Sequence, residues 1–245
     1  GEVGTGKTTI VRSLLERRPG HADVAVILNP QLTPVEFVLT ICEELGIFMR
    51  DEDTTSIKDL VDLLNRRLLE AHAKGRRIVV IVDEAQNLMP ATLEQVRLLT
   101  NLETASQKLL QIILIGQPEL REVLDRVELR QLAQRITGRY HLAPLSRSET
   151  ASYVNHRLKV AGAMGEIFSS AALREVHRLS GGIPRIINVI CDRALLGAFT
   201  QEQHRIGPGM IREAASEVYG RSFSPPWLKM LVGSAGSVAV LGLVL

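Results

Sequence analysis

The chain has 245 residues, 45% of them hydrophobic, which is enough for a packed domain of ordinary size and a smaller partner domain. The formal net charge is only +2, with Lys and Arg mixed among Asp and Glu, and this balance argues against a dedicated nucleic-acid-binding protein. Cys42 and Cys191 stand far apart in apolar stretches, and the six histidines show no metal-ligand spacing, so neither a disulfide scaffold nor a metal cage is expected.

The first half of the chain alternates apolar strand patterns with amphipathic helix patterns, the order that predicts a parallel sheet flanked by helices. Capping boxes at Thr33–Glu36, Ser56–Asp59 and Ser146–Glu149 mark the starts of helices, and the strands are short continuous apolar runs, as expected where both faces of a strand are buried. We expect helices over about 7–18, 34–46 and 57–75, and strands over about 24–28, 78–82, 110–115 and, shorter, 139–143.

The pattern changes after Pro144, where helix patterns follow one another with no strand pattern between them. They cover about 146–161, 170–179, 185–199 and 210–219. We therefore expect an α/β domain over 1–145, a small all-helical domain over 146–219 and a linker over 220–227, whose two prolines cannot continue a helix.

An apolar segment over 228–245 ends the sequence, and from Met230 onward it carries no charged residue. We expect it to be the start of a transmembrane helix that is shorter here than a full span, with a buried core helix as the alternative. Trp227 suits the membrane interface, and Lys229 and Arg221 place the preceding domains in the cytoplasm. Because residue 1 already belongs to a motif, we expect the sequence to be a piece of a longer protein.

The motif at the start of the chain reads Gly-Glu-Val-Gly-Thr-Gly-Lys-Thr and matches the G-x-x-x-x-G-K-[ST] phosphate loop in full. Its glycines let backbone N–H groups converge on phosphate oxygens, and the following helix adds its positive end. Lys7 is expected to reach the β- and γ-phosphates of ATP, and the Thr8 hydroxyl to bind Mg²⁺. The motif opens directly into a helix, which favours a phosphate loop over an ordinary glycine-rich turn. The residues expected to contact the nucleotide here are Gly1, Gly4, Thr5, Gly6, Lys7, Thr8 and Thr9.

The apolar run 78–82 is followed directly by Asp83 and Glu84. A buried strand would deliver Asp83 to its carboxyl end, where the carboxylate can help to hold Mg²⁺. Glu84 is then placed to orient and polarise the attacking water as a general base. A strand that ends in Asp-Glu is common by itself, but here it follows a phosphate loop by about one β-α-β-α interval, which favours the catalytic interpretation.

Polar side chains near the ends of later elements are further candidates. Gln117 follows the run 110–115 and could hydrogen-bond the γ-phosphate or the water, although a turn residue before a proline is a near-equal alternative. Arg135 and Arg139 could reach the nucleotide of a neighbouring subunit, and Arg185 could fold back over the phosphates from the helical domain. The plain alternative for each arginine is a solvated surface or first-turn residue.

In their order along the chain, these elements resemble AAA+ ATPases over about residues 1–218. The resemblance implies a P-loop NTPase sheet flanked by helices, a small helical lid, and ATP bound with Mg²⁺ between the subunits of a homo-oligomeric ring. By position it also implies that Gln117 is the first sensor, Arg185 the second sensor and Arg135 the arginine finger, with Arg139 in reserve.

Four segments look more narrowly like the general secretion pathway protein A family: 82–88, 115–120, 134–136 and 187–196. That resemblance implies a bacterial inner-membrane ATPase with a cytoplasmic AAA+ domain, one membrane span and a periplasmic peptidoglycan-binding part that this sequence does not contain. It also implies a role in assembling the secretin of type II secretion, together with a membrane partner protein of the same pathway.

Other functions compete with this reading. A DNA-binding ATPase, like those of transposition, would need a basic stripe on its surface. The near-neutral charge and the apolar C-terminal segment argue against this function. A slow nucleotide-dependent scaffold is the third possibility, and the presence of both Asp83 and Glu84 speaks against it. Nucleic acid is therefore not expected as a partner.

Overall fold

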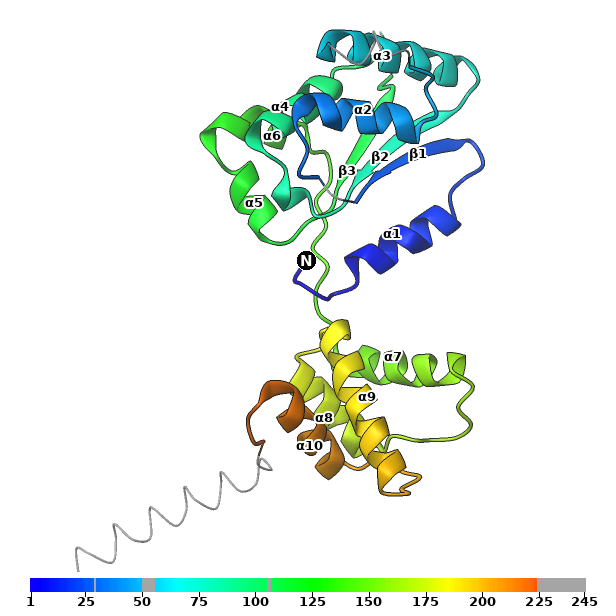
Figure 1. The fold of residues 1–245 in the computed structure, drawn as a ribbon, viewed down its shortest axis with the longest axis vertical. Coiled ribbons are helices and arrows are strands. Elements are labelled where there is room, and N and C mark those ends of the chain that lie inside the picture. The colour runs from blue at the N-terminus through cyan, green and yellow to red at the C-terminus, as the bar shows by residue number, and fades with distance from the viewer. Residues whose placement is uncertain (29, 50–55, 105–106, 224–245) are drawn as a thin grey trace, which may run out of the picture. The chain divides into compact units, whose positions relative to one another are not determined.

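The computed structural model describes residues 1–28, 30–49, 56–104 and 107–223. They belong to two compact units, Gly1–Leu142 and a second that begins at Ala143, and each unit has its own hydrophobic core. Figure 1 shows the strands in the first unit and a purely helical second unit. Both cysteines are buried and free, and burial raises the pKa of the Cys42 thiol to about 11, which fits unreactive core residues.

The described part of the first unit contains a three-stranded parallel sheet in the order β1-β2-β3. Its strands are β1 (Ala22–Ile27), β2 (Arg77–Val82) and β3 (Leu110–Leu114). Ile27 of β1 pairs with Val82 of β2, which pairs with Leu114 of β3, so the carboxyl ends of the strands lie level. Residues that follow Val82 and Leu114 in sequence are therefore neighbours in space, and the parallel sheet predicted from the sequence is confirmed.

The helices of the first unit lie around this sheet (Figure 1). Helices α2 and α3 pack on β1 and β2, where Phe37, Ile41, Leu60 and Leu64 are fully buried. Each such side chain contributes about 1.5–3 kcal/mol by leaving water. The helical elements of this unit are α1 (Lys7–Glu16), α2 (Pro34–Glu44), α3 (Ile57–Ala73), η2 (Ala85–Asn87), α4 (Pro90–Leu99), α5 (Glu119–Leu124), η3 (Val127–Leu129) and α6 (Arg130–Arg135).

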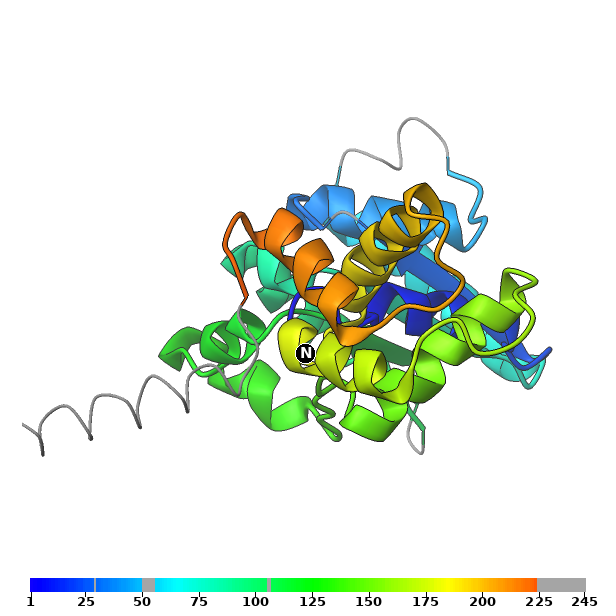
Figure 2. The same cartoon turned by 90° about the horizontal axis from the view of Figure 1, so that it is seen from below.

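The second unit is built from α7 (Arg147–Val160), α8 (Ser170–Ser180), α9 (Pro184–Thr200) and α10 (Pro208–Tyr219). In Figure 2 these helices run from yellow-green to orange, and α10 packs on both α8 and α9. The capping box predicted at the start of α7 is present: the Ser146 hydroxyl accepts from the Glu149 N–H, and the Glu149 carboxylate accepts from the Ser146 N–H. After α8, Gly182 approaches the backbone of Leu145 so closely that a Cβ would lie 2.1 Å from the Leu145 carbonyl oxygen.

The short strand expected over 139–143 is not formed, and that prediction was wrong. A strand exists only where a neighbour accepts and donates backbone hydrogen bonds, and within the described ranges no segment pairs with these residues. Helices α4, α5 and α6 were not predicted from the sequence.

The predicted transmembrane segment 228–245 lies outside the described residues, as does the second half of the predicted linker 220–227. The described beginning of the linker folds onto the second unit: Phe223 packs against its core and meets Tyr219 edge to face, with ring centroids 5.5 Å apart. No helix within the described ranges is both long and apolar enough to cross a bilayer.

Candidate nucleotide site

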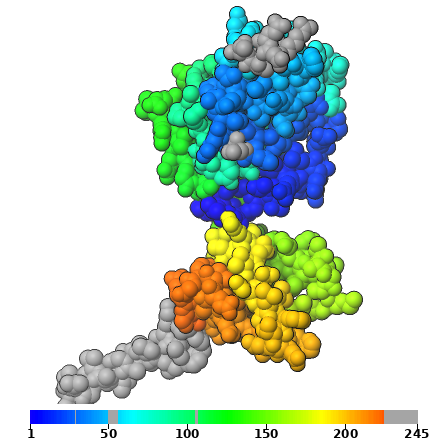
Figure 3. Space-filling model, in the orientation of Figure 1, coloured from blue at the N-terminus to red at the C-terminus, as the bar shows by residue number. Residues whose placement is uncertain are grey.

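The phosphate loop is the turn that leads into α1, and two of its glycines have positive φ angles, 81° at Gly4 and 98° at Gly6. The buried Thr5 closes the loop, because its hydroxyl donates to the Glu2 carbonyl oxygen over 2.8 Å. Gly6 is the N-cap residue of α1, and no side chain of the described residues caps this helix. The positive end of α1 is therefore open to an anion, as a phosphate-binding helix requires. In Figure 3 the loop and α1, in dark blue, lie at the surface of the first unit.

Lys7 reaches across this loop. Its Nζ donates to the carbonyl oxygens of Gly1 and Glu2, both at 2.9 Å. An ammonium group has three donors, so two carbonyl contacts leave capacity for a phosphate oxygen. The loop carbonyls thus hold the Lys7 charge at the open end of α1.

Thr8 and Asp83 join the loop to the end of β2. The Thr8 hydroxyl donates to Asp83 Oδ2 over 2.9 Å, and Asp83 Oδ1 accepts from the Glu84 N–H at 2.9 Å. Asp83 is only 3% exposed. A hydroxyl and a carboxylate in contact provide the hard oxygen ligands that Mg²⁺ prefers, so these residues fit the predicted metal. No cluster of three or more His, Cys, Asp or Glu within the described ranges could hold a metal, so Mg²⁺ here would also need water and nucleotide oxygens, as is usual for this ion.

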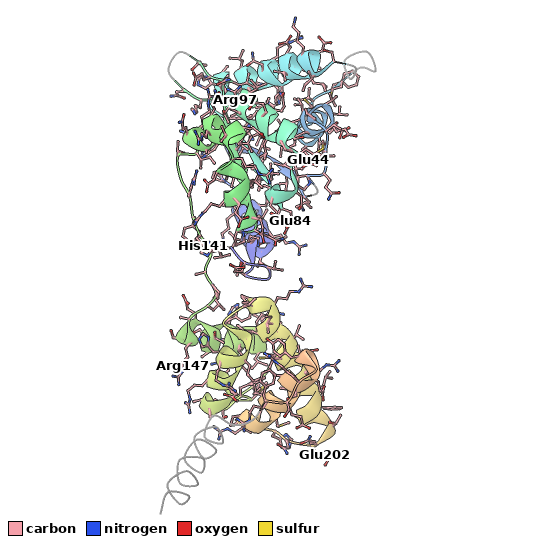
Figure 4. The ribbon with its side chains drawn as sticks, turned by 90° about the vertical axis from the view of Figure 1, so that its left-hand side faces the viewer. Glu44, Glu84, Arg97, His141, Arg147 and Glu202 are labelled. Atoms are coloured by element: carbon pink, nitrogen blue, oxygen red, sulfur yellow. The ribbon has the colours of Figure 1, made fainter. Side chains whose placement is uncertain are left out.

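Glu84 lies beside this pair and has an unusual backbone, with a φ of 52° in the left-handed region that favours glycine. Its Oε2 accepts two hydrogen bonds, from Gln117 Nε2 at 3.0 Å and from Gln86 Nε2 at 2.6 Å. These two amides, helped by the charge of Lys7 and opposed by partial burial, hold the pKa of Glu84 below its usual range. Glu84 is therefore ionised at neutral pH, the state that a general base needs. Figure 4 labels Glu84 beside the blue ribbon of the loop and α1.

Gln117 enters the site from the end of β3, as the level strand ends require. Besides its side-chain bond to Glu84, its backbone N–H donates to Gln86 Oε1 at 3.0 Å. The first residue of the loop lies close by, with Gly1 N 3.3 Å from the Gly116 carbonyl oxygen. The structure thus brings together Lys7, Thr8, Asp83, Glu84 and Gln117 from three separate parts of the sequence.

The sequence model of a family described as AAA domain matches residues 1–124. The chain belongs to the AAA family. AAA domains bind nucleotides through a phosphate loop, and nucleotide hydrolysis is the general activity of such proteins.

One relative of this AAA protein is general secretion pathway protein A of Aeromonas hydrophila, which is 52% identical over 241 residues. The alignment covers 98% of this chain and 44% of that protein, so the chain spans less than half the length of the relative. The resemblance to general secretion pathway protein A inferred from the sequence is confirmed.

Solved structures share the fold of this AAA protein at low sequence identity. Cdc6p from Pyrobaculum aerophilum has a TM-score of 0.70 at 21% identity, over 89% of this chain and 59% of the other. The Drosophila origin recognition complex bound to DNA gives 0.63 at 22% identity, over 89% and 54%. The ADP form of ORC2 from Aeropyrum pernix gives 0.59 at 15% identity, over 89% and 60%. At these identities the similarity establishes the fold alone.

The predicted arginines lie in three different parts of the chain. Arg135 ends α6, and its guanidinium donates to Thr100 Oγ1 at 3.2 Å and to Asn101 Oδ1, at the end of α4. Arg139 is exposed, in the stretch that forms no strand. Arg185 is exposed in the first turn of α9, in the second unit.

Thr9, also predicted to contact nucleotide, is exposed on α1.

Sequence reasoning missed Gln86, which contacts both Glu84 and Gln117. Gln86 stands two residues after Glu84, and in a strand that continued past Asp83 the two side chains would share one face of the sheet. This spacing was the signal in the sequence that could have placed Gln86 near Glu84. What the spacing could not show is the turn of η2 that carries the amide back to the carboxylate.

Proposed function

We propose that the protein is an ATPase that converts ATP and water to ADP and phosphate, with Mg²⁺ as its cofactor. The observation that supports this best is the Glu84 carboxylate, held by two amides beside Lys7 and beside the Thr8–Asp83 pair. A base, a cation for the phosphates and oxygen ligands for a metal are the parts that phosphoryl transfer to water requires.

Each residue has a distinct role in this proposal. The backbone of the loop, the positive end of α1 and Lys7 bind the β- and γ-phosphates. Thr8 and Asp83 would hold Mg²⁺, which would supply positive charge to the phosphate oxygens. Glu84 takes the proton of the attacking water, and Gln117 hydrogen-bonds the water or the γ-phosphate.

The arginines complete the site through other parts of the assembly. We assign Arg135 as a finger that acts on the nucleotide of a neighbouring subunit in a homo-oligomeric ring, with Arg139 as the alternative. Arg185 acts as a second sensor from the helical unit, which serves as the lid of the site. In this scheme the α/β domain covers 1–145 and the lid 146–219.

The cellular role rests on the relative whose printed name is general secretion pathway protein A. We propose that the protein is an assembly ATPase of a type II secretion pathway that assists the assembly of its secretin. It works with a membrane partner of that pathway, from the bacterial inner membrane, with the ATPase domain in the cytoplasm. The segments 220–227 and 228–245 serve as linker and membrane helix, and peptidoglycan would be bound by a domain beyond this sequence.

Two substitutions in the full-length protein test the chemistry. Lys7→Ala should abolish ATP binding, because the phosphates lose their main counter-charge. Glu84→Gln keeps the shape of the site but removes the base, so ATP should bind with near-normal affinity and turn over very slowly. Binding of a fluorescent ATP analogue and release of phosphate are the measurements. Wild-type turnover by Glu84→Gln would rule out the role given to Glu84.

A further inference from the structure

We propose that Gln86 positions the general base Glu84. Its amide binds Glu84 Oε2 and also accepts from the backbone of Gln117, so that the other carboxylate oxygen, Glu84 Oε1, faces the reacting water. This inference rests on the ATPase function proposed above. It assigns Gln86 no contact with nucleotide or water, since it acts through Glu84.

Three hydrogen bonds close a ring around the base. Gln86 Nε2 donates to Glu84 Oε2 at 2.6 Å, Gln117 Nε2 donates to the same oxygen at 3.0 Å, and the Gln117 N–H donates to Gln86 Oε1 at 3.0 Å. Both amides therefore converge on one carboxylate oxygen. Glu84 Oε1 takes part in no hydrogen bond with the described residues, which leaves it as the acceptor for a water proton.

The orientation of the Gln86 amide follows from its partners. A backbone N–H can only donate, so the Gln86 atom that meets the Gln117 N–H must be the carbonyl oxygen. The opposite end of the amide, which faces Glu84, must then be the NH₂ group. Glutamate at this position could still accept from Gln117, but it would set a second carboxylate against Glu84.

The backbone prepares this contact from both sides. The positive φ of Glu84 reverses the chain into η2, and the Ala85 N–H donates to the Ile115 carbonyl oxygen at 2.8 Å, which anchors the turn to the end of β3. On the facing segment, a Cβ on Gly116 would lie 2.9 Å from Gln86 Oε1 and 2.9 Å from Leu120 Cδ2. The glycine thus provides the space that the Gln86 amide fills.

The decisive test removes the Gln86 amide in the full-length protein. Gln86→Leu should lower kcat for ATP about ten- to hundredfold, the range expected for losing a hydrogen bond to a charged group, while KM and the thermal midpoint change little. Gln86→Glu keeps the acceptor for Gln117 but repels Glu84, so its kcat should fall at least as far. Gln203→Leu, the same change at an exposed position of the second unit, should behave as wild type. A wild-type kcat for Gln86→Leu, or a loss confined to KM or to stability, would overturn the proposal.

A double-mutant cycle separates positioning from a direct role. If Gln86 acts only through Glu84, adding Gln86→Leu to Glu84→Gln should cause less than about a threefold further loss in single-turnover hydrolysis. A second full ten- to hundredfold loss in that background would refute the coupling. Wild-type turnover by Glu84→Gln would refute the role of Glu84 as the base, and with it the proposed function. An inactive Glu84→Gln together with a Gln86→Leu variant of normal kcat would refute only the positioning role of Gln86.

Gly116→Ala is an independent variant in case Gln86→Leu does not fold. The new methyl group would press on both the Gln86 amide and Leu120. We expect the same fall in kcat with unchanged binding of a fluorescent ATP analogue and an unchanged thermal midpoint, which separates displacement of the amide from general destabilisation. A wild-type kcat for Gly116→Ala would count against the proposal.

Discussion

The hydroxyl of Thr8 donates to Oδ2 of Asp83 over 2.9 Å, although 75 positions separate the two residues in the chain. This bond joins the first turn of α1 to the carboxyl end of β2. It brings a hydroxyl oxygen and a carboxylate oxygen from distant parts of the chain into contact. The relative position of Thr8 and Asp83 is therefore set by how α1 and β2 pack in the folded unit, and neither segment determines it alone.

Removal of the Thr8 hydroxyl should therefore weaken the use of Mg²⁺. In Thr8→Ala we expect the Mg²⁺ concentration for half-maximal turnover to rise by about tenfold or more, since one oxygen ligand is lost and Asp83 loses its partner. Thr8→Ser keeps the hydroxyl and serves as the control, with a Mg²⁺ dependence close to that of the wild type. Titration of turnover with MgCl₂ is the measurement, and equal curves for Thr8→Ala and Thr8→Ser would contradict the assignment.

The helical unit has its own acid-sensitive contact. Glu175 is 7% exposed and accepts from Arg178 Nη2 at 2.7 Å and from Arg212 Nη1 at 3.2 Å. The hydrogen bond from Arg178, followed by the one from Arg212, holds the pKa of Glu175 below its ordinary value, against the opposing effect of burial. Because the folded pKa is depressed, this contribution to stability is fully present above the ordinary pKa of about 4.3 and is lost as the pH falls through the folded value.

We expect Glu175→Gln to lower the free energy of unfolding at pH 7 by about 1–3 kcal/mol, because two guanidinium groups lose their counter-charge. The difference between wild type and variant should shrink as the pH is lowered below about 4.3. Urea unfolding followed by circular dichroism between pH 7 and pH 3 measures both. A difference independent of pH would show that the ionisation of Glu175 does not contribute.

Local signals in the sequence were enough to predict much of this fold. The capping boxes at Thr33 and Ser146 form as expected, because each involves residues only three positions apart. The box predicted at Ser56 is not formed, since the Ser56 hydroxyl accepts from the Lys58 N–H instead. Buried strands such as 78–82 were evident from continuous apolar runs. Helix α4 was missed, because Thr92 and Gln95 are polar yet buried and so interrupt the apolar pattern, and its N-cap residue Met89 gives no capping signal.

Contacts between distant segments could not be read in the same way. The strand expected over 139–143 depends on a neighbour to pair with, which a local pattern does not reveal. The role of Gln86 depends on the left-handed backbone of Glu84, a conformation that residues other than glycine rarely adopt. It also depends on Gly116, which stands thirty positions after Gln86 in the sequence. The type of each site residue was evident from its motif, but its partner was evident only from the fold.

Arg135 should act on a neighbouring subunit, since within its own chain it donates to Thr100 and Asn101 and not to the residues of the loop. Arg135→Ala should bind ATP normally and lose about 10³-fold or more in turnover, as arginine fingers do. Mixing it with Lys7→Ala protein should restore part of the activity, because one variant supplies the finger and the other the intact site. Phosphate release by the mixed and separate proteins is the measurement.

Asn101→Ala is the control for a local role of Arg135. It removes a partner of the guanidinium but not the guanidinium itself, so turnover should stay within about threefold of wild type. A loss equal to that of Arg135→Ala would mean that the contact at the end of α4 matters, and not a finger. Full activity of Arg135→Ala with loss in Arg139→Ala would move the finger to Arg139.

The segment 228–245 should anchor the full-length protein in the membrane, with the ATPase domain in the cytoplasm. From Met230 to Leu245 no residue is charged, and each Leu or Val favours insertion by about 0.3–0.6 kcal/mol at the centre of a span. A lysine there costs about 2.5–3.5 kcal/mol, so Val238→Lys should release much of the protein from the membrane fraction, whereas Val238→Leu should not. Cell fractionation and a reporter fused beyond the segment are the measurements. Full-length protein that is extracted without detergent, or a reporter active only in the cytoplasm, would refute the span.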